Sequence, residues 1–227
     1  MIGPFSLVCL DMAGTTVRDD GAVETAFEAA LASVGVEPGS APFVRAQQVV
    51  RDTMGWSKAD VFARLLEPEA AGRATEAFAA SYEAVVATGQ VAEIPGAAAV
   101  LRRLRGHGVL VCLTTGFAPS TRDALIGALG WGAEIDLALS PADVGRGRPA
   151  PDMVLGAMAR LGVPDAAAVA VVGDTASDLE AGTAAGAGAV IGVLSGAHDE
   201  ATLAAAPHSA LVPDVTWVPG VLERGGR

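Results

Sequence analysis

Short apolar runs alternate with longer segments whose apolar residues recur at helical spacing. The first run, residues 5–10 (FSLVCL), is apolar on both faces and ends at Asp11, which is typical of a strand buried in a parallel sheet. Later runs predict strands at residues 109–114, 135–139, 169–172 and 189–194, with an edge element at 211–215. Helical spacing between these runs predicts helices at residues 97–105, 120–129, 151–161 and 177–185.

The regular alternation of strands and helices from residue 95 onward predicts the fold class. Strand-helix-strand units connect by right-handed crossovers and build a parallel sheet with helices on both faces. We therefore expect an α/β fold with a doubly wound parallel sheet.

The segment between Gly21 and Gly89 has a different pattern, in which no part resembles a strand. Apolar residues at helical spacing predict helices at residues 23–34, 43–50, 57–66 and 68–88. Ser57, with Asp60 three residues later, predicts a capping box at the start of the third of these helices. The first strand is thus followed by an all-helical insertion. We predict an α/β core formed by residues 1–17 and 96–227 and a helical cap domain formed by residues 18–95.

Composition and charge bear on whether the protein binds nucleic acid or a membrane and on its cellular compartment. The 227 residues are 51% hydrophobic and carry a net charge of -11, which argues against nonspecific binding to nucleic acid or a membrane surface. No apolar run reaches the roughly 18 residues of a membrane helix, and no basic segment precedes an apolar one at the N-terminus. Cys9 and Cys112 both fall in predicted buried strands, so we expect a cytoplasmic protein with reduced thiols.

Polar groups with different chemistry follow the predicted strands. Asp11 ends the first, Thr115-Gly116 follows the second, Arg148 lies in the Gly/Pro loop after the third, and Asp174 follows the fourth with Asp178 four residues later. Open α/β sheets bind their ligands at the carboxyl ends of the strands, so these groups should meet at one edge. The three His residues, His107, His198 and His208, match no ligand pattern, and we interpret them as surface residues.

In order and type these groups resemble the four motifs of the haloacid dehalogenase (HAD) superfamily over nearly the whole chain. The sequence Asp11-Met12-Ala13-Gly14-Thr15-Thr16 is similar to that of its phosphonatase (phosphonoacetaldehyde hydrolase) branch, as is Arg at position 148, where most HAD proteins have Lys. The resemblance implies an HAD-like core, a small phosphonate or phosphate substrate, and a homodimer formed through the cap.

The resemblance also implies a role for each residue. Asp11 would be the nucleophile that forms an aspartyl-phosphate, with Thr115 and Arg148 as further catalytic groups. Asp11, Asp174 and the carbonyl of Ala13 would bind Mg²⁺. Thr175 and Asp178 would position these groups. Substrate contacts are implied for the following residues: Ala13, Gly14, Thr15, Met54 and Gly116.

Lys58 is the only lysine beside fourteen arginines, and an amine differs from a guanidinium where it must lose a proton or form a covalent bond. Met54-Gly55-Trp56-Ser57-Lys58 resembles the phosphonatase cap segment whose lysine forms a Schiff base with the substrate aldehyde. Ordinary HAD phosphatases carry an acid where this chain has Ala13, so leaving-group help must come from elsewhere. The phosphonatase pattern also has a His where this chain has Val61.

Three functional interpretations follow. The first is cleavage of the C–P bond of phosphonoacetaldehyde or a related compound through aspartyl-phosphate and Lys58. The second is a phosphatase for another small metabolite, in which Lys58 pairs with a substrate anion or a leaving oxygen. The third is a noncatalytic protein that binds phosphorylated metabolites. The intact set of Asp11, Thr115, Arg148 and Asp174 argues against the third.

Overall fold

The computed structural model describes residues 2–18 and 20–225. Its centre is a parallel sheet in the order β3-β2-β1-β4-β5-β6. The strands are β1 (Leu7–Asp11), β2 (Leu110–Thr114), β3 (Leu137–Leu139), β4 (Val169–Gly173), β5 (Ala189–Val193) and β6 (Ala210–Val212). The predicted parallel α/β sheet is therefore confirmed, including its edge strand.

Strand β1 lies inside the sheet because its residues alternate between two apolar layers. Val8 and Leu10 belong to one hydrophobic cluster, and Leu7 and Cys9 to another. All four are fully buried. Burial on both faces explains why the run is apolar without alternation.

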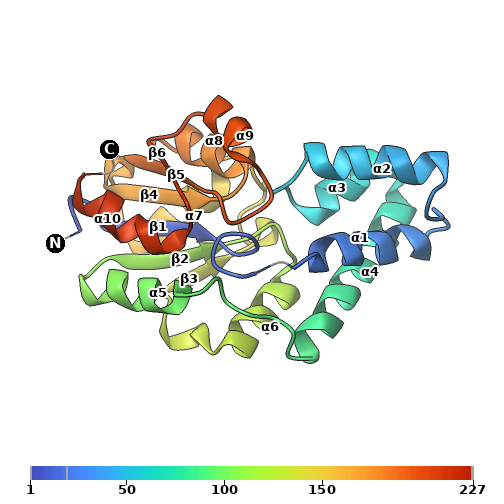
Figure 1. Ribbon diagram of the computed structural model, residues 1–227, viewed down its shortest axis with the longest axis horizontal. Helices are drawn as coiled ribbons and strands as arrows, with labels where there is room; N and C mark the ends of the chain where they lie inside the picture. Colours follow the sequence, from blue (N-terminus) through green and yellow to red (C-terminus); the bar gives the residue numbers. More distant parts are fainter. Residues whose placement is uncertain (1, 19, 226–227) are drawn as a thin grey trace.

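Helices cover both faces of the sheet (Figure 1). They are α5 (Ala97–Gly106), α6 (Pro119–Leu129), α7 (Asp152–Leu161), α8 (Ala176–Ala184), α9 (Glu200–Ala205) and α10 (Val218–Glu223), with 3-10 turns at Trp131–Ala133, Pro141–Asp143, Ala166–Ala168 and Val215–Trp217. Helices α5 and α10 contribute to the cluster that contains Val8, whereas α7 contributes to the one that contains Leu7. The short helices α9 and α10 were not predicted.

Between β1 and α5 the described chain contains only helices: α1 (Ala22–Ser33), α2 (Ala41–Asp52), α3 (Lys58–Leu65) and α4 (Pro68–Ala87). We call residues 22–87 the helical insertion. In Figure 1 it stands as a group beyond one end of the sheet. Its centre is an aromatic cluster in which Phe27 contacts Phe62 and Phe78 at ring distances of 5.2 and 4.9 Å. The boundaries predicted for a cap domain stay a prediction.

Helix α4 connects the helical insertion to the core by packing against α6. Tyr82 of α4 lies 4.6 Å from the ring of Phe117, which follows β2. Within the described residues, no helix has the length and apolar character needed to cross a membrane.

Candidate active site

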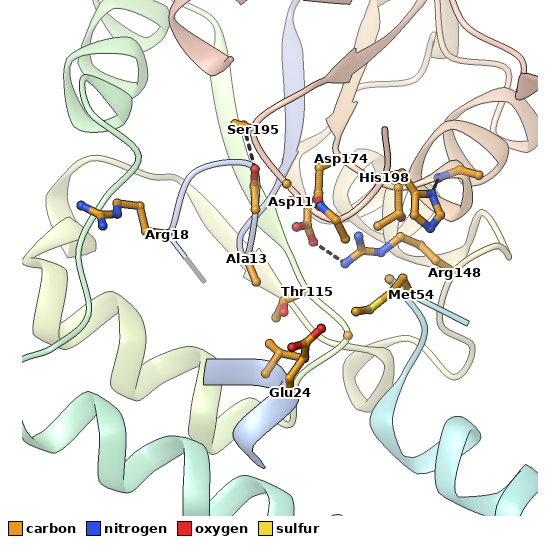
Figure 2. Close-up of a pocket in the computed structure, with 18 of the residues that line it drawn as sticks. Asp11, Ala13, Arg18, Glu24, Met54, Thr115, Arg148, Asp174, Ser195 and His198 are labelled. Atoms are coloured by element: carbon orange, nitrogen blue, oxygen red, sulfur yellow. Dashed lines mark hydrogen bonds and ion pairs between the residues drawn. The ribbon is translucent and has the colours of Figure 1, made fainter. Parts of the chain in front are cut away.

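A cleft of about 1120 Å³ lies where the strand ends of the core meet the helical insertion (Figure 2). Asp11 is the last residue of β1 and pairs in register with Thr114 of β2, so Thr115 follows beside it. The cleft brings together most of the residues predicted for the site, namely Asp11, Ala13, Gly14, Met54, Lys58, Thr115, Gly116, Arg148, Asp174 and Thr175.

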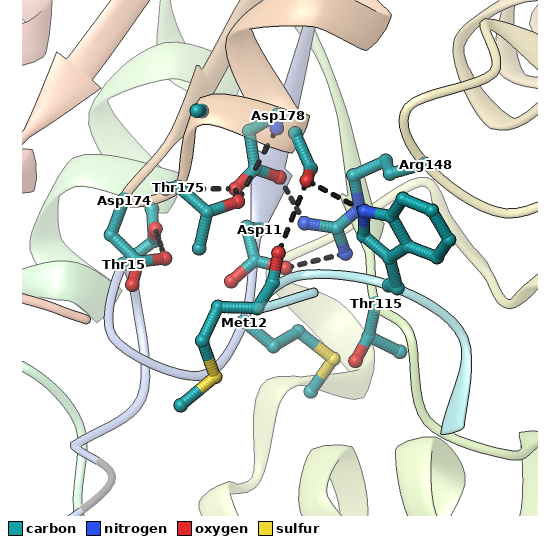
Figure 3. A network of polar contacts seen from close by, with 12 residues as sticks. Asp11, Met12, Thr15, Thr115, Arg148, Asp174, Thr175 and Asp178 are labelled. Carbon is teal, nitrogen blue, oxygen red and sulfur yellow. Dashed lines mark hydrogen bonds and ion pairs between the residues drawn. The ribbon is translucent and has the colours of Figure 1, made fainter. Parts of the chain in front are cut away.

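Arg148 connects two carboxylates beneath the cleft (Figure 3). One terminal nitrogen lies 2.7 Å from Oδ1 of Asp11, and the other donates to Oδ1 of Asp178. All three side chains are buried. A planar guanidinium can hold two carboxylates in fixed positions in this way, whereas an ammonium is a point charge.

Asp178 also closes the first turn of α8. Its Oδ2 accepts hydrogen bonds from the backbone N–H of Thr175 at 3.1 Å and from Oγ1 of Thr175 at 2.5 Å. The backbone N–H of Asp178 donates in turn to Oγ1 of Thr175 at 3.3 Å. This capping box fixes the start of the helix directly after Asp174.

Asp174 is enclosed by two loops. Its Oδ1 accepts a hydrogen bond from the hydroxyl of Thr15 at 3.0 Å, and its Oδ2 accepts one from the backbone N–H of Ala197 at 2.7 Å. Thr15, predicted to contact substrate, is thus fully buried behind the carboxylate. A Cβ on Gly14 or Gly196 would lie 2.4 or 2.0 Å from Oδ2 of Asp174, so both positions require glycine.

The site concentrates negative charge. When ionised, Asp11, Asp174 and Asp178 carry three negative charges against the one positive charge of Arg148. Burial raises the pKa of Asp11 well above its usual value, although Arg148 acts in the opposite direction. Burial, followed by the charge of Asp178, raises the pKa of Asp174 to about 6. Burial alone would lower the pKa of Arg148, but Asp11 and Asp178 raise it, so the guanidinium stays charged.

This excess of buried carboxylates fits a divalent cation with oxygen ligands. Among residues 2–18 and 20–225, no group of three or more His, Cys, Asp or Glu side chains is arranged to hold a metal ion. The ligand set implied by the family resemblance, two carboxylates and the carbonyl of Ala13, has fewer such side chains and stays a prediction.

Lys58 extends from the first turn of α3 into an aromatic pocket. Its Nζ lies 5.3 Å from the ring centre of Phe27, 5.7 Å from that of Phe78 and 5.5 Å from that of Phe117. Rings at these distances attract an ammonium through cation–π interactions. The residue is buried, and it also lines the cleft opposite the strand ends.

The backbone of Lys58 is attached to the core, because its N–H donates to the carbonyl of Gly116 at 3.2 Å. Ser57 precedes α3 as predicted, but its side chain makes no capping hydrogen bond in the described part of the chain. Its Cβ instead packs against Gly147, where an added Cβ would lie 3.2 Å away. The predicted capping box of Ser57 and Asp60 is therefore wrong.

His198 is a residue of the cleft that sequence reasoning missed. The sequence matches no ligand pattern around it and predicts a surface residue, but His198 is half-buried and lines the cleft. Its Nδ1 accepts a hydrogen bond from the backbone N–H of Ala176 at 3.0 Å, and burial lowers its pKa. The signal was its position shortly after β5, at the same edge of the sheet as Asp11 and Asp174. His107 and His208 are exposed as predicted.

Comparisons with known proteins agree with this geometry. A family model described as haloacid dehalogenase-like hydrolase matches residues 5–186. The chain is 33% identical over 221 residues to a Dickeya dadantii protein named "Probable phosphatase IndB", covering 94% of this chain and 92% of that protein. It is 35% identical over 109 residues to a phosphonoacetaldehyde hydrolase of Bacteroides fragilis, which covers 48% of this chain and 41% of that protein.

A solved structure with a similar fold is that of a phosphonoacetaldehyde hydrolase-like protein from Oleispira antarctica. The TM-score is 0.80 and the sequence identity is 25%, and the match covers 99% of this chain and 96% of that chain. The similarity therefore includes both the sheet and the helical insertion.

Proposed function

The chain belongs to the haloacid dehalogenase-like hydrolase family, and from this premise we propose that it is a Mg²⁺-dependent phosphohydrolase in which Asp11 accepts the phosphoryl group. The resemblance seen in the motifs is thus confirmed at the level of the family. The observation that supports the proposal best is the meeting of Asp11, Thr115, Arg148 and Asp174 at one edge of the sheet.

Asp11 would attack phosphorus in line with the bond that breaks, and water would then hydrolyse the aspartyl-phosphate. Arg148 holds Oδ1 of Asp11 in place for this step. Thr115 and the amide of Gly116 would donate to the phosphoryl oxygens. Thr15 would act through Asp174, whose carboxylate its hydroxyl holds.

The metal would be held by Asp11, Asp174 and the backbone carbonyl of Ala13. Mg²⁺ would supply positive charge that neutralises the phosphoryl oxygens. The protein groups prepare this site in advance, since Thr15 and the amide of Ala197 fix the orientation of Asp174.

We propose phosphonoacetaldehyde or a related small phosphonate as the first candidate substrate. Nζ of Lys58 would add to the aldehyde carbon with loss of water to form an iminium. The C–P bond would break as its electron pair moves into the iminium, giving an enamine, while Asp11 takes the phosphoryl group. Hydrolysis would then release acetaldehyde from the lysine. Burial of Lys58 at the cleft supports this role, and Ala13 provides no acid for a simple alkoxide leaving group.

A small phosphate ester is the second candidate substrate, and a specific observation favours it. The three rings around Nζ of Lys58 favour the ammonium form, which would stabilise a leaving oxygen rather than attack an aldehyde. The Dickeya dadantii relative, similar over 94% of this chain, is also named as a phosphatase.

The function is tested by Mg²⁺-dependent phosphate release from phosphonoacetaldehyde and a panel of phosphate esters. We expect Asp11→Asn to abolish release, and activity that survives this change would contradict the role of Asp11. Borohydride added with phosphonoacetaldehyde then separates the two substrates. Because Lys58 is the only lysine, an adduct on it supports C–P cleavage. No adduct, together with unchanged turnover in Lys58→Arg, excludes the Schiff base.

A further inference from the structure

One short segment of the helical insertion, residues 54–58, runs from the turn after α2 to the first residue of α3 and contacts the core through the hydroxyl of Ser177. Oγ of Ser177 accepts a hydrogen bond from Nε1 of Trp56 at 3.0 Å and donates one to the carbonyl of Met54 at 3.1 Å. Ser177 lies in the first turn of α8, three residues after Asp174. A single hydroxyl therefore satisfies both an indole and a backbone carbonyl of the opposite part of the molecule.

The backbones on the two sides of this contact approach closely. A Cβ on Gly55 would lie 2.4 Å from Oγ1 of Thr175, and a Cβ on Gly116 would lie 2.3 Å from the carbonyl oxygen of Trp56. Gly55 also has a φ of 83°, a conformation that favours glycine. The segment consequently fits the core in one position, and small displacements would break its hydrogen bonds.

Trp56 is held at both ends of its side chain. The guanidinium of Arg64, in the last turn of α3, lies 4.7 Å from the ring centre, and the indole N–H reaches Ser177. An aromatic ring supported by a cation and by one directed hydrogen bond has little freedom to turn. Trp56 is thus a rigid connection between α3 and the start of α8.

We propose that Ser177 and Trp56 form a clasp that holds residues 54–58 on the core and thereby places Lys58 in the cleft. Lys58 follows the clasp by two residues, and its own N–H donates to Gly116. Ser177 is a positioning residue, because it acts through Lys58. The proposal rests on the proposed function only where turnover is concerned, since the position of the lysine can be measured without activity.

The contact itself is tested by NMR of the indole N–H groups. The chain has three Trp residues, so three indole signals are expected, and Trp56→Phe identifies the one that belongs to Trp56. Ser177→Ala should shift this signal and speed its exchange with water. Ser33→Ala is the control, because the hydroxyl of Ser33 donates to Ala30 within α1. An unmoved Trp56 signal in Ser177→Ala overturns the clasp.

The effect on Lys58 is tested with an amine-reactive reagent and mass spectrometry, with the α-amino group as the internal reference. We expect Ser177→Ala and Trp56→Phe each to raise the labelling rate of Lys58 about threefold to tenfold, the effect of one hydrogen bond. In the double variant the labelling rate of Lys58 should be only slightly higher than in either single variant, because both changes break the same contact. A shifted indole signal with unchanged labelling shows that the contact does not position Lys58 and overturns the proposal.

Turnover provides a third readout when a substrate is found. Ser177→Ala should lower kcat about threefold to tenfold in the natural chain and have no further effect on the turnover that remains in a Lys58→Met background. A loss of the same size in both backgrounds means that Ser177 acts elsewhere and contradicts the proposal. If no compound in the panel is hydrolysed, the proposed function fails, while the labelling result still decides whether the clasp positions Lys58.

Discussion

Arg148 lies 2.7 Å from Oδ1 of Asp11, so the carboxylate proposed to accept the phosphoryl group is already fixed by a buried guanidinium. The side chains are only 4% and 8% exposed. Two charges removed from water are stable only while both are present, because either one alone loses solvation without compensation. The pair therefore connects the stability of the fold to the geometry of the site.

We predict that Arg148→Ala both abolishes phosphate release and destabilises the protein by about 3 to 5 kcal/mol, the cost of leaving a buried charge without its partner. Arg148→Lys should retain part of the stability and less of the activity, because an ammonium lacks the two separate terminal nitrogens that contact Asp11 and Asp178. Urea unfolding and phosphate release measure the two effects.

Arg146→Ala is the matched control for this prediction. Arg146 lies two residues away, its side chain is 73% exposed, and it pairs with Asp152. Exposed pairs contribute about 0 to 1 kcal/mol, so stability and turnover should change little. Equal losses of stability and phosphate release in Arg146→Ala and Arg148→Ala would show that these losses come from disturbing the loop and not from removing the buried guanidinium.

We predict that Mg²⁺ stabilises the chain against heat, because the proposed site would place it where three carboxylates face one guanidinium. At a concentration about 100 times the dissociation constant, a ligand of the folded state contributes about 2.7 kcal/mol, which corresponds to a rise in Tm of about 5 to 10 °C. The rise should be much smaller in Asp174→Asn. Thermal unfolding with Mg²⁺ or with EDTA measures it without any substrate.

Asp165→Asn serves as the comparison for the metal. Asp165 is exposed and precedes β4, whereas Asp174 follows the same strand at the opposite edge of the sheet. This variant should show the full Mg²⁺ effect. If Mg²⁺ raised the Tm of Asp174→Asn by the same amount, this would contradict the proposal that Asp174 binds the metal.

The strands and the polar groups at their ends could be predicted because both depend on local sequence. A run such as residues 5–10 has to be buried on both faces, and the polar residue that ends it has to lie at the edge. The same reasoning failed for α9, in which only Leu203 is buried, and for α10, which contains Pro219 and Gly220. At 6 residues each, these helices are shorter than the window of about 11 to 18 residues in which helical spacing is recognised.

The contacts that complete the site were not predictable, since they join residues far apart along the chain. Thr15 and Asp174 are 159 positions apart, and Trp56 and Ser177 are 121 apart. Serine and threonine hydroxyls carry no pattern that names a distant partner. The hydroxyl of Ser177 could be interpreted only after the fold had placed Trp56 next to it.

We predict that Gly116→Ala impairs both the contact between the helical insertion and the core and the activity. The new Cβ would lie 2.3 Å from the carbonyl oxygen of Trp56, and a backbone atom cannot move away as a flexible side chain can. Because overpacking of this kind typically costs about 1 to 3 kcal/mol, we expect lower stability together with faster labelling of Lys58.

Gly127→Ala provides the control for the added methyl group. Gly127 lies within α6, and a Cβ there would meet nothing within 4 Å. Alanine is the better helix former, so this variant should be neutral or more stable by up to about 1 kcal/mol. If Gly116→Ala and Gly127→Ala have the same stability and the same labelling rate of Lys58, the close approach of Gly116 to Trp56 is not important for holding residues 54–58 on the core.

We predict that the carboxylate of Asp143, which lies outside the proposed metal ligand set, stabilises the protein at neutral pH and loses this effect in acid. Burial acts to raise the pKa of Asp143, but the hydrogen bond from the N–H of Ser140 at 2.8 Å and the guanidinium of Arg122 lower it below its usual value. A carboxyl whose pKa is lower in the folded than in the unfolded state stabilises the fold above the unfolded value, about 3.9. This contribution is lost as the pH falls through the folded value.

Asp143→Asn should therefore destabilise the protein at pH 7 by about 1 kcal/mol, and the difference from the natural chain should shrink as the pH approaches 3. Urea unfolding at several pH values measures it. Asp123→Asn is the control, because Asp123 also pairs with Arg122 but is 64% exposed, so its effect should be small throughout. If Asp143→Asn lowers the free energy of unfolding by the same amount at every pH, the asparagine destabilises the loop for steric reasons. The charge of Asp143 would then not stabilise the loop.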